Sequence, residues 1–129
     1  MFRGRDARRN RHAAFHPQGF GVIAPEDAFV AAVNTCVMMM FIWSAERFKL
    51  GLVSYECRAE GVKRIELDRT EIFTEVMLHP RIVVHSDAAG RESLLRRVQR
   101  ALESAVKYSL VANSIKSKLA VEPEIEVVT

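Results

Sequence analysis

Two thiols and a pair of carboxylates are the side chains of this sequence best suited to chemistry. Cys36 lies inside an almost unbroken apolar run, NTCVMMMFIW at 34–43, and Cys57 follows further along the chain. Glu26 and Asp27 precede Cys36 by ten and nine positions. A thiol in such surroundings could be core filling, a metal ligand, one half of a disulfide or a nucleophile shielded from water.

The composition and spacing argue against several kinds of site. No second cysteine and no histidine stands at a metal-ligand spacing from either cysteine, so we expect no metal site. The sequence lacks a GxSxG motif and a glycine-rich phosphate loop, the signatures of many hydrolases and nucleotide-binding proteins. Two cysteines do not make a disulfide framework in a chain of 129 residues, and the segment 1–20 contains no apolar secretory stretch. We therefore expect reduced thiols and a cytoplasmic protein.

A long helix is predicted around Cys36. Pro25 and the two carboxylates after it suit a first helical turn, and no breaker follows before Gly51, so the helix should end near Phe48 or Lys49. The helix is apolar nearly all round, which indicates burial on most sides. Its apolar stretch is shorter than a bilayer span, so we expect no membrane as a partner.

Alternating apolar and polar residues predict two strands after this helix. The first runs over 52–60 and ends at Gly61, and its apolar face carries Val53, Tyr55, Cys57 and Ala59. The second covers 72–84, where Pro80 indicates an edge position, a bulge or a break. The first strand places Cys57 among inward-packing residues, which favours core filling for this thiol.

The remaining elements complete an α+β pattern. An amphipathic helix is predicted from Arg91, followed by a short helical segment within 111–118 and a last strand over 119–128 that Pro123 interrupts. This order predicts an α+β domain. One amphipathic helix and three strands cannot cover a helix that is apolar all round. A homodimer is the simplest source of the missing cover.

The basic residues are concentrated at the start of the chain. The segment 1–20 holds five arginines and one aspartate, whereas the remainder of the chain is close to neutral. We interpret 1–20 as a basic, solvated arm and 21–129 as a single domain. A nucleic acid is the partner that such an arm could bind, but we do not expect one.

The segment APEDAFVAAVNTCVMMMFIWSAERFKL resembles the signature helix of the OsmC/Ohr family of thiol-dependent hydroperoxide reductases. The shared pattern is Pro25-Glu26, a helix of small and apolar residues, Cys36 ten positions after the glutamate, and Arg47 before a glycine. The family's next two strands, its second helix and its last strand resemble GLVSYECRAEG, IFTEVMLHPRIVV and RESLLRRVQRALESAVKYSLVANSIKSKLAVE. The resemblance covers about residues 23–128. It implies an OsmC-like fold, in which a long buried central helix packs with antiparallel strands and a second amphipathic helix, and an intertwined dimer with sites at the interface.

The resemblance also implies roles for particular residues. Cys36 would attack the O–O bond of an organic hydroperoxide as a thiolate and become a sulfenic acid. Glu26 would orient an N-terminal arginine of the family that keeps the thiol ionised. No arginine matches that position, since the last one in the arm, Arg11, precedes Glu26 by only half of the family's spacing. The family's second, resolving cysteine corresponds to Ser109, so the resemblance implies an external thiol reductant and no cofactor.

Two interpretations of the function stay open. The joint presence of Pro25, Glu26 and Cys36 favours a thiol peroxidase that reduces organic hydroperoxides. Ser109 and the missing arginine favour an OsmC-fold dimer without turnover, which binds an apolar ligand or acts as a scaffold. Ten residues along a straight helix rise about 15 Å and turn by about 280°. A site shared by Glu26 and Cys36 therefore needs a bend, a bridging arginine or the partner chain.

Overall fold

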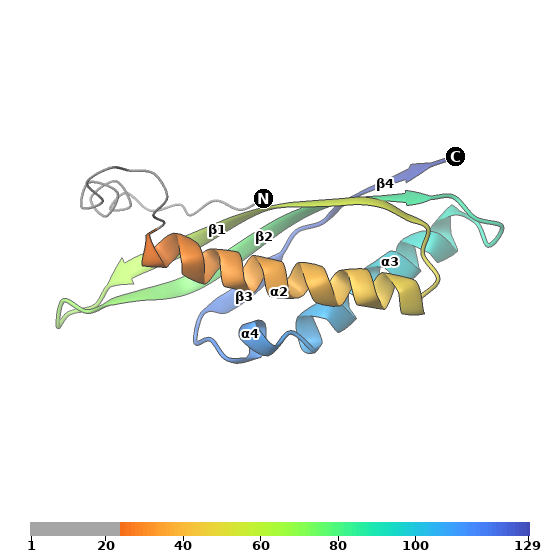
Figure 1. Cartoon of the computed structure of the whole chain (residues 1–129). Helices are drawn as coiled ribbons and strands as arrows, with labels where there is room; N and C mark the ends of the chain where they lie inside the picture. The colour runs from red at the N-terminus through yellow and green to blue at the C-terminus, as the bar shows by residue number, and fades with distance from the viewer. Residues whose placement is uncertain (1–23) are drawn as a thin grey trace.

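The computed structural model describes residues 24–129, which form a mixed sheet with helices packed against one face (Figure 1). In chain order the elements are α2 (Pro25–Arg47), β1 (Leu52–Ile65), β2 (Glu71–His85), α3 (Arg91–Lys107), α4 (Leu110–Asn113), β3 (Lys118–Val121) and β4 (Glu124–Val128). This arrangement confirms the predicted α+β class. The basic arm at 1–20 lies outside the described residues.

The long central helix, α2, has the ends that its sequence predicts. Pro25 occupies the first turn, where its missing N–H costs no hydrogen bond, and two carboxylates follow at the positive end of the helix dipole. At the other end, the backbone N–H of Phe48 donates to the carbonyl oxygen of Ser44. Lys49 then adopts a positive φ of 56° and turns the chain towards β1. Contrary to the expectation that its apolar stretch is too short, α2 is long and apolar enough to cross a membrane by length and composition alone, and 39% of its most apolar window is buried inside this domain.

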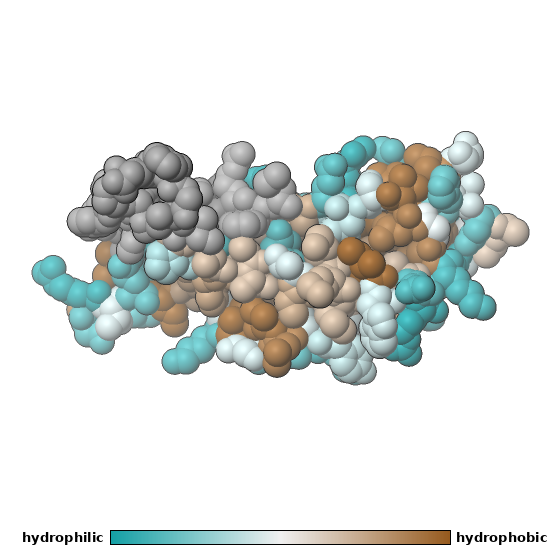
Figure 2. Space-filling view, in the orientation of Figure 1, coloured by the Kyte–Doolittle hydropathy of each residue, from teal (hydrophilic) through white to brown (hydrophobic). Residues whose placement is uncertain are grey.

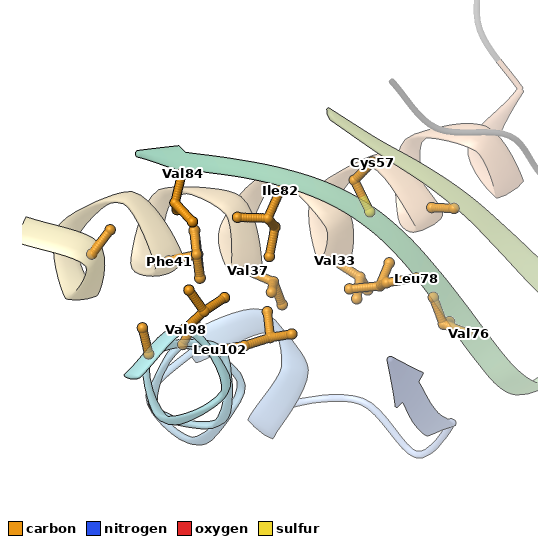
Figure 3. Packing of buried hydrophobic residues seen from close by; sticks show 14 of the residues in the cluster. Val33, Val37, Phe41, Cys57, Val76, Leu78, Ile82, Val84, Val98 and Leu102 are labelled. Atoms are coloured by element: carbon orange, nitrogen blue, oxygen red, sulfur yellow. The ribbon is translucent and has the colours of Figure 1, made fainter. Parts of the chain in front are cut away.

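One face of α2 forms the centre of the hydrophobic core. Figure 3 shows side chains of α2 between those of β2 and α3, and the fully buried ones include Val33, Val37, Phe41, Leu78, Ile82, Val84 and Val98. Complete burial of such a side chain stabilises the fold by about 1.5–3 kcal/mol. The opposite face of α2 is exposed. The composition of the helix predicts burial on most sides, and within one chain this prediction is wrong.

The sheet combines both strand directions, so among residues 24–129 the expected antiparallel pairing is found only between β1 and β2. β1 and β2 form a long antiparallel hairpin, and β3 and β4 both run parallel to β2 along its other edge. β3 ends at Val121, opposite Leu78, and β4 begins at Glu124, opposite Arg81. Pro80 thus lies beside the gap between these two short strands. The predicted edge, bulge or break in β2 is therefore wrong, because the interruption falls in the neighbouring strands instead.

The strand β1 departs from its prediction at both ends. It does not stop at Gly61 but continues to Ile65, and a Cβ at position 61 would lie 2.5 Å from the ring of Phe73. The glycine is thus needed for close packing and does not end the strand. Val53 is 50% exposed and not on the core face, because the pairing with β2 shifts register between residues 52 and 54.

Candidate active site

Cys36 lies on a flank of α2 that faces away from β1. The Nδ2 of Asn34 donates to the backbone carbonyl oxygen of Cys57 at 3.4 Å, so the flank that carries Asn34 faces β1. Cys36 is two residues further on, about 200° around the helix axis. Its side chain is partly exposed, whereas Cys57 is buried. The two thiols therefore point in different directions from the helix–sheet interface.

Cys57 has the surroundings of a core residue. Its side chain is 3% exposed, and its Sγ lies 3.7 Å from the carbonyl oxygen of Arg58. Burial raises the pKa of the Cys57 thiol, and the neighbouring Tyr55 side chain offsets this only in part. Burial also raises the pKa of Tyr55, whose ring packs 5.2 Å from that of Phe41. Cys57 is thus a protonated, enclosed thiol, which agrees with its prediction as core filling.

Glu26 has a basic neighbour that the sequence analysis missed. The Nζ of Lys63 lies 3.5 Å from a carboxylate oxygen of Glu26 and 3.3 Å from one of Glu71. The Lys63 side chain is only 5% exposed. Because the prediction ended β1 at Gly61, it left Lys63 outside the sheet. The contact joins residues 37 positions apart, and no local sequence signal indicates it.

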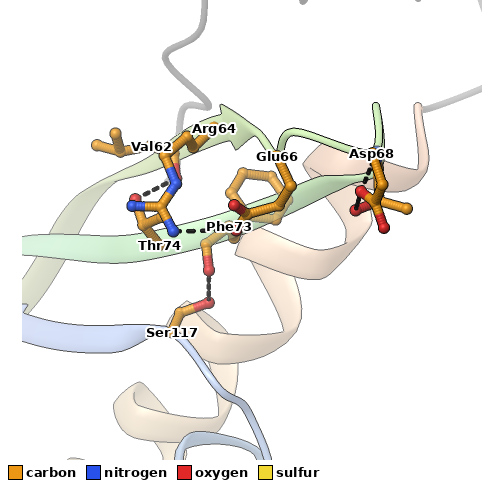
Figure 4. Close-up of polar contacts among 8 residues, drawn as sticks. Val62, Arg64, Glu66, Asp68, Phe73, Thr74 and Ser117 are labelled. Carbon is orange, nitrogen blue, oxygen red and sulfur yellow. Dashed lines mark hydrogen bonds and ion pairs between the residues drawn. The ribbon is translucent and has the colours of Figure 1, made fainter.

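A pocket of about 290 Å³ opens beside this ion pair. It is lined by Pro25, Glu26, Phe29, Lys63, Glu71, Ile72 and Phe73. The rings of Phe29 and Phe73 are stacked with centroids 4.8 Å apart. Figure 4 shows the hydroxyl of Ser117 next to Phe73, where it donates to the carbonyl oxygen of Phe73 at 2.6 Å. The pocket therefore combines apolar walls with a cation and two carboxylates. Such a site suits a ligand with an apolar body and a polar end.

The structure does not bring Glu26 and Cys36 together within one chain. Figure 1 shows α2 as one continuous helix, and ten residues of it rise about 15 Å. A bend in α2 therefore does not bring Glu26 and Cys36 together. Among residues 24–129, no group of three His, Cys, Asp or Glu side chains is placed to hold a metal ion.

Ser109 is buried at the start of α4, a short helix packed against α2. Its hydroxyl accepts a hydrogen bond from the backbone N–H of Ala112 at 3.3 Å, which caps the helix. The side chain thus has a structural role in the fold. The correspondence of Ser109 to the family's resolving cysteine stays a prediction.

The outer face of α2 is apolar and uncovered in the single chain. Figure 2 shows brown, apolar areas among teal, polar ones on the side of the molecule that carries α2. Met39 is 63% exposed and Trp43 is 52% exposed, and Ile42 lies between them. Cys36 lies one turn before Met39. An exposed apolar strip of this kind marks an interaction surface.

Comparison with known proteins gives consistent matches. A family model described as OsmC-like protein matches residues 21–124. An OsmC-like protein of unknown function from Vibrio cholerae has a TM-score of 0.71 at 24% identity, over 86% of this chain and 72% of that chain. An OsmC-like protein from Mycoplasma pneumoniae has a TM-score of 0.70 at 13% identity, over 88% and 79%. A Legionella pneumophila protein described as the organic hydroperoxide resistance protein OsmC has a TM-score of 0.61 at 18% identity, over 83% and 72%. No curated protein matches the sequence.

Proposed function

The chain belongs to the OsmC-like protein family, and from this membership we propose that it reduces organic hydroperoxides through Cys36 as a homodimer. The observation that carries the proposal is the contrast between the two thiols. Cys36 is partly exposed on an apolar helix flank, whereas Cys57 is enclosed in the core. The description of the Legionella relative as an organic hydroperoxide resistance protein supports the substrate class.

The chemistry begins with attack by the Cys36 thiolate on the terminal oxygen of the hydroperoxide. An S–O bond forms, the O–O bond breaks, and the departing alkoxide takes a proton and leaves as an alcohol. The sulfur is thereby oxidised by two electrons to a sulfenic acid. An external thiol then condenses with the sulfenic acid, releasing water and forming a mixed disulfide, and a second thiol releases Cys36.

The reductant comes from outside the chain. Ser109 cannot form a disulfide, and its hydroxyl caps α4. Cys57 is buried on the β1 side of α2, away from the flank that carries Cys36. We therefore infer a small dithiol or a dithiol protein as the reductant, without a bound cofactor. Such a reductant is available in a reducing compartment such as the cytoplasm.

The dimer is supported by the outer face of α2. Met39, Ile42 and Trp43 form an exposed apolar strip beside Cys36. A two-fold interface uses the same surface on both subunits, so a second copy of the chain packed on the outer face of α2 would shield this apolar surface from water. A dimer could also combine Glu26 and Cys36 in one site, because one subunit would supply Glu26 and the other Cys36.

The proposal is tested by trapping the oxidised thiol. Reduced protein is mixed with cumene hydroperoxide or with hydrogen peroxide in the presence of dimedone, and the modified residue is identified by mass spectrometry. We expect stoichiometric labelling of Cys36, faster with the organic peroxide, and no labelling in Cys36→Ser. The matched variant Cys57→Ser should react like the wild type. A reaction no faster than that of free cysteine would contradict the proposal.

A second candidate function is a dimer without turnover that binds an apolar ligand. The observation that favours it is the pocket whose walls include Phe29, Ile72 and Phe73. In this case an apolar fluorescent probe would bind equally well to the wild type and to Cys36→Ser. Dimedone would label neither protein after treatment with peroxide.

A further inference from the structure

Cys36 needs a cation that its own stretch of helix does not provide. Residues 32–40 carry no charged side chain. Apolar surroundings disfavour a thiolate, so a reactive thiol here requires a positive group close by. Among residues 24–129, Cys36 makes no hydrogen bond that could take the place of such a group. The question is which cation can approach it.

The basic side chains along α2 lie too far from Cys36 in the same chain. Arg47 is eleven residues further on, and its guanidinium carbon sits 4.9 Å above the ring of Trp43. Lys63 lies against Glu26, ten residues before Cys36. Each of these separations is at least about 15 Å along the helix axis. Neither cation therefore meets the thiol of its own chain.

Lys63 is nevertheless well placed to meet an anion from another molecule. Its side chain is almost fully buried. Burying a charged group costs free energy unless negative groups lie beside it, and Glu26 and Glu71 do so. It also lines the pocket of about 290 Å³ at the start of α2. A cation held at the wall of an open, largely apolar pocket can interact strongly with an anion that enters, because little water screens it.

Two-fold symmetry determines which residues of the two helices face each other. When two copies of α2 cross antiparallel, Cys36 lies opposite the partner's Glu26 if the crossing point is Ala31, halfway between the two positions. The exposed residues beside this point, Ala28 and Ala32, are small. Small side chains at a contact allow helix axes to approach closely. This crossing is therefore sterically available.

The alternative crossing would bring the partner's Arg47 to Cys36. Its midpoint falls between Phe41 and Ile42, where the exposed side chains are large; Trp43 next to it is 52% exposed. Large side chains there would hold the helices further apart. Arg47 is also engaged with that indole ring. The N-terminal crossing, with Lys63 as the cation, is the more favourable of the two.

We propose that Lys63 of one chain faces Cys36 of its partner and stabilises the thiolate there. The pocket beside Lys63 then receives the apolar part of the hydroperoxide, against Phe29 and Phe73. Glu26 and Glu71 hold the ammonium in place through the two ion pairs. This inference rests on the proposed function, because it assumes the homodimer and a reactive Cys36.

The test uses mixed dimers and a reaction that involves no peroxide. Two differently tagged chains are co-expressed, and heterodimers are purified through both tags. The rate of alkylation of Cys36 by iodoacetamide is measured by mass spectrometry between pH 5 and 9. In the Lys63→Met homodimer we expect alkylation at neutral pH to be about tenfold slower, with its pH profile displaced upwards by about one unit. Lys63→Arg should retain most of the wild-type rate.

Complementation between subunits decides whether Lys63 acts on the partner. A heterodimer of Lys63→Met with Cys36→Ser contains one Cys36 opposite an intact Lys63, so we expect its Cys36 to regain the wild-type rate. The matched control pairs Lys63→Met with a Cys36→Ser/Lys63→Met double variant, and its rate should stay low. Failure of the first heterodimer to recover, or a wild-type rate in the Lys63→Met homodimer, would overturn the inference.

The outcome is separable from that of the proposed function. If dimedone trapping fails in the wild type but the mixed dimers regain alkylation, the peroxidase proposal fails and the role of Lys63 stands. If trapping succeeds and the mixed dimers do not regain alkylation, the peroxidase proposal stands and the role of Lys63 fails. Thermal unfolding of each variant shows whether a slow rate comes from a damaged fold.

Discussion

The side-chain amide of Asn34 donates to the backbone carbonyl oxygen of Cys57 at 3.4 Å. The flank of α2 that carries Asn34 therefore faces β1. Cys36, two residues later, consequently belongs to the other flank. The two thiols of the chain therefore have different surroundings, although both lie in apolar stretches of the sequence. Cys36 is partly accessible to solvent, whereas Cys57 is part of the core.

Selective thiol labelling should follow from this separation. With iodoacetamide at pH 8 we expect alkylation of Cys36 in the folded protein and protection of Cys57, because Cys57 is enclosed and its pKa is raised by burial. In guanidinium chloride both should react at similar rates. Peptide mapping by mass spectrometry measures the two rates. Equal labelling of both cysteines in the folded state would show that the Cys57 site is open.

Stability should fall in alkaline solution. Burial raises the pKa of Cys57 from its ordinary value of 9.0 and that of Tyr55 from 10.0. Above about pH 9 the unfolded chain loses these protons first, while the folded chain retains them. The contribution of these two groups to the free energy of unfolding is thus intact below pH 9. It is lost as the pH rises, by at most about 1.4 kcal/mol per pH unit for each group.

Urea unfolding at pH 8 and pH 10.5 measures this loss. Tyr55→Phe should weaken the pH dependence, because it removes one of the two buried acids. Tyr108→Phe is the control, since Tyr108 is 57% exposed and its substitution leaves both buried acids in place. The same pH dependence in Tyr55→Phe as in the wild type would exclude a contribution from Tyr55.

A thiol introduced by Ser109→Cys should restore a resolving group if the proposed function is correct. The position is buried at the start of α4, which packs against α2. After treatment with cumene hydroperoxide we expect an intrachain disulfide with Cys36, seen in the intact mass and in non-reducing peptide maps. Loss of the serine cap should cost about 1 kcal/mol. Ser114→Cys, at the exposed end of α4, is the control; disulfide formation equal in both would argue against a specific geometry.

Gly61→Ala should destabilise the domain. An added Cβ would lie 2.5 Å from the ring of Phe73 and 2.9 Å from Val30, so β1, β2 or α2 must shift. We expect a loss of about 1–3 kcal/mol in the free energy of unfolding. Gly51→Ala should cost less, because its Cβ would meet only His85, at 3.1 Å. Adding Phe73→Leu to Gly61→Ala should recover part of the lost stability. If the two substitutions change the free energy of unfolding by strictly additive amounts, a clash between the added Cβ and Phe73 is not the cause.

Met39→Asp should separate the subunits of the proposed dimer. In a monomer, Met39 is 63% exposed, so the change should alter stability by no more than about 0.5 kcal/mol. At a two-fold interface it would bury two carboxylates and favour dissociation. Sedimentation velocity gives the oligomeric state. Glu46→Gln, at an exposed position near the end of α2, is the control, and an unchanged sedimentation coefficient in Met39→Asp would exclude this face from the interface.

The helices of this protein are determined largely by local sequence. Pro25 and the carboxylates after it begin α2, and the spacing of apolar residues from Arg91 predicts α3. A helix forms its hydrogen bonds within a few residues of chain, so these signals are close together in the sequence. The family pattern around Cys36 likewise lies within one stretch of chain, which is why the resemblance could indicate roles for Cys36 and Glu26 from the sequence.

Only the tertiary structure decided what surrounds these residues. Strand pairing continued β1 past Gly61 and brought Lys63 against Glu26, 37 positions away. The same pairing placed Pro80 beside the gap between β3 and β4. Contacts between strands and across the core depend on register and on which faces meet, and short stretches of sequence do not encode these relations. The chemistry of the candidate site therefore depends on the fold as a whole, although its thiol is evident from the sequence.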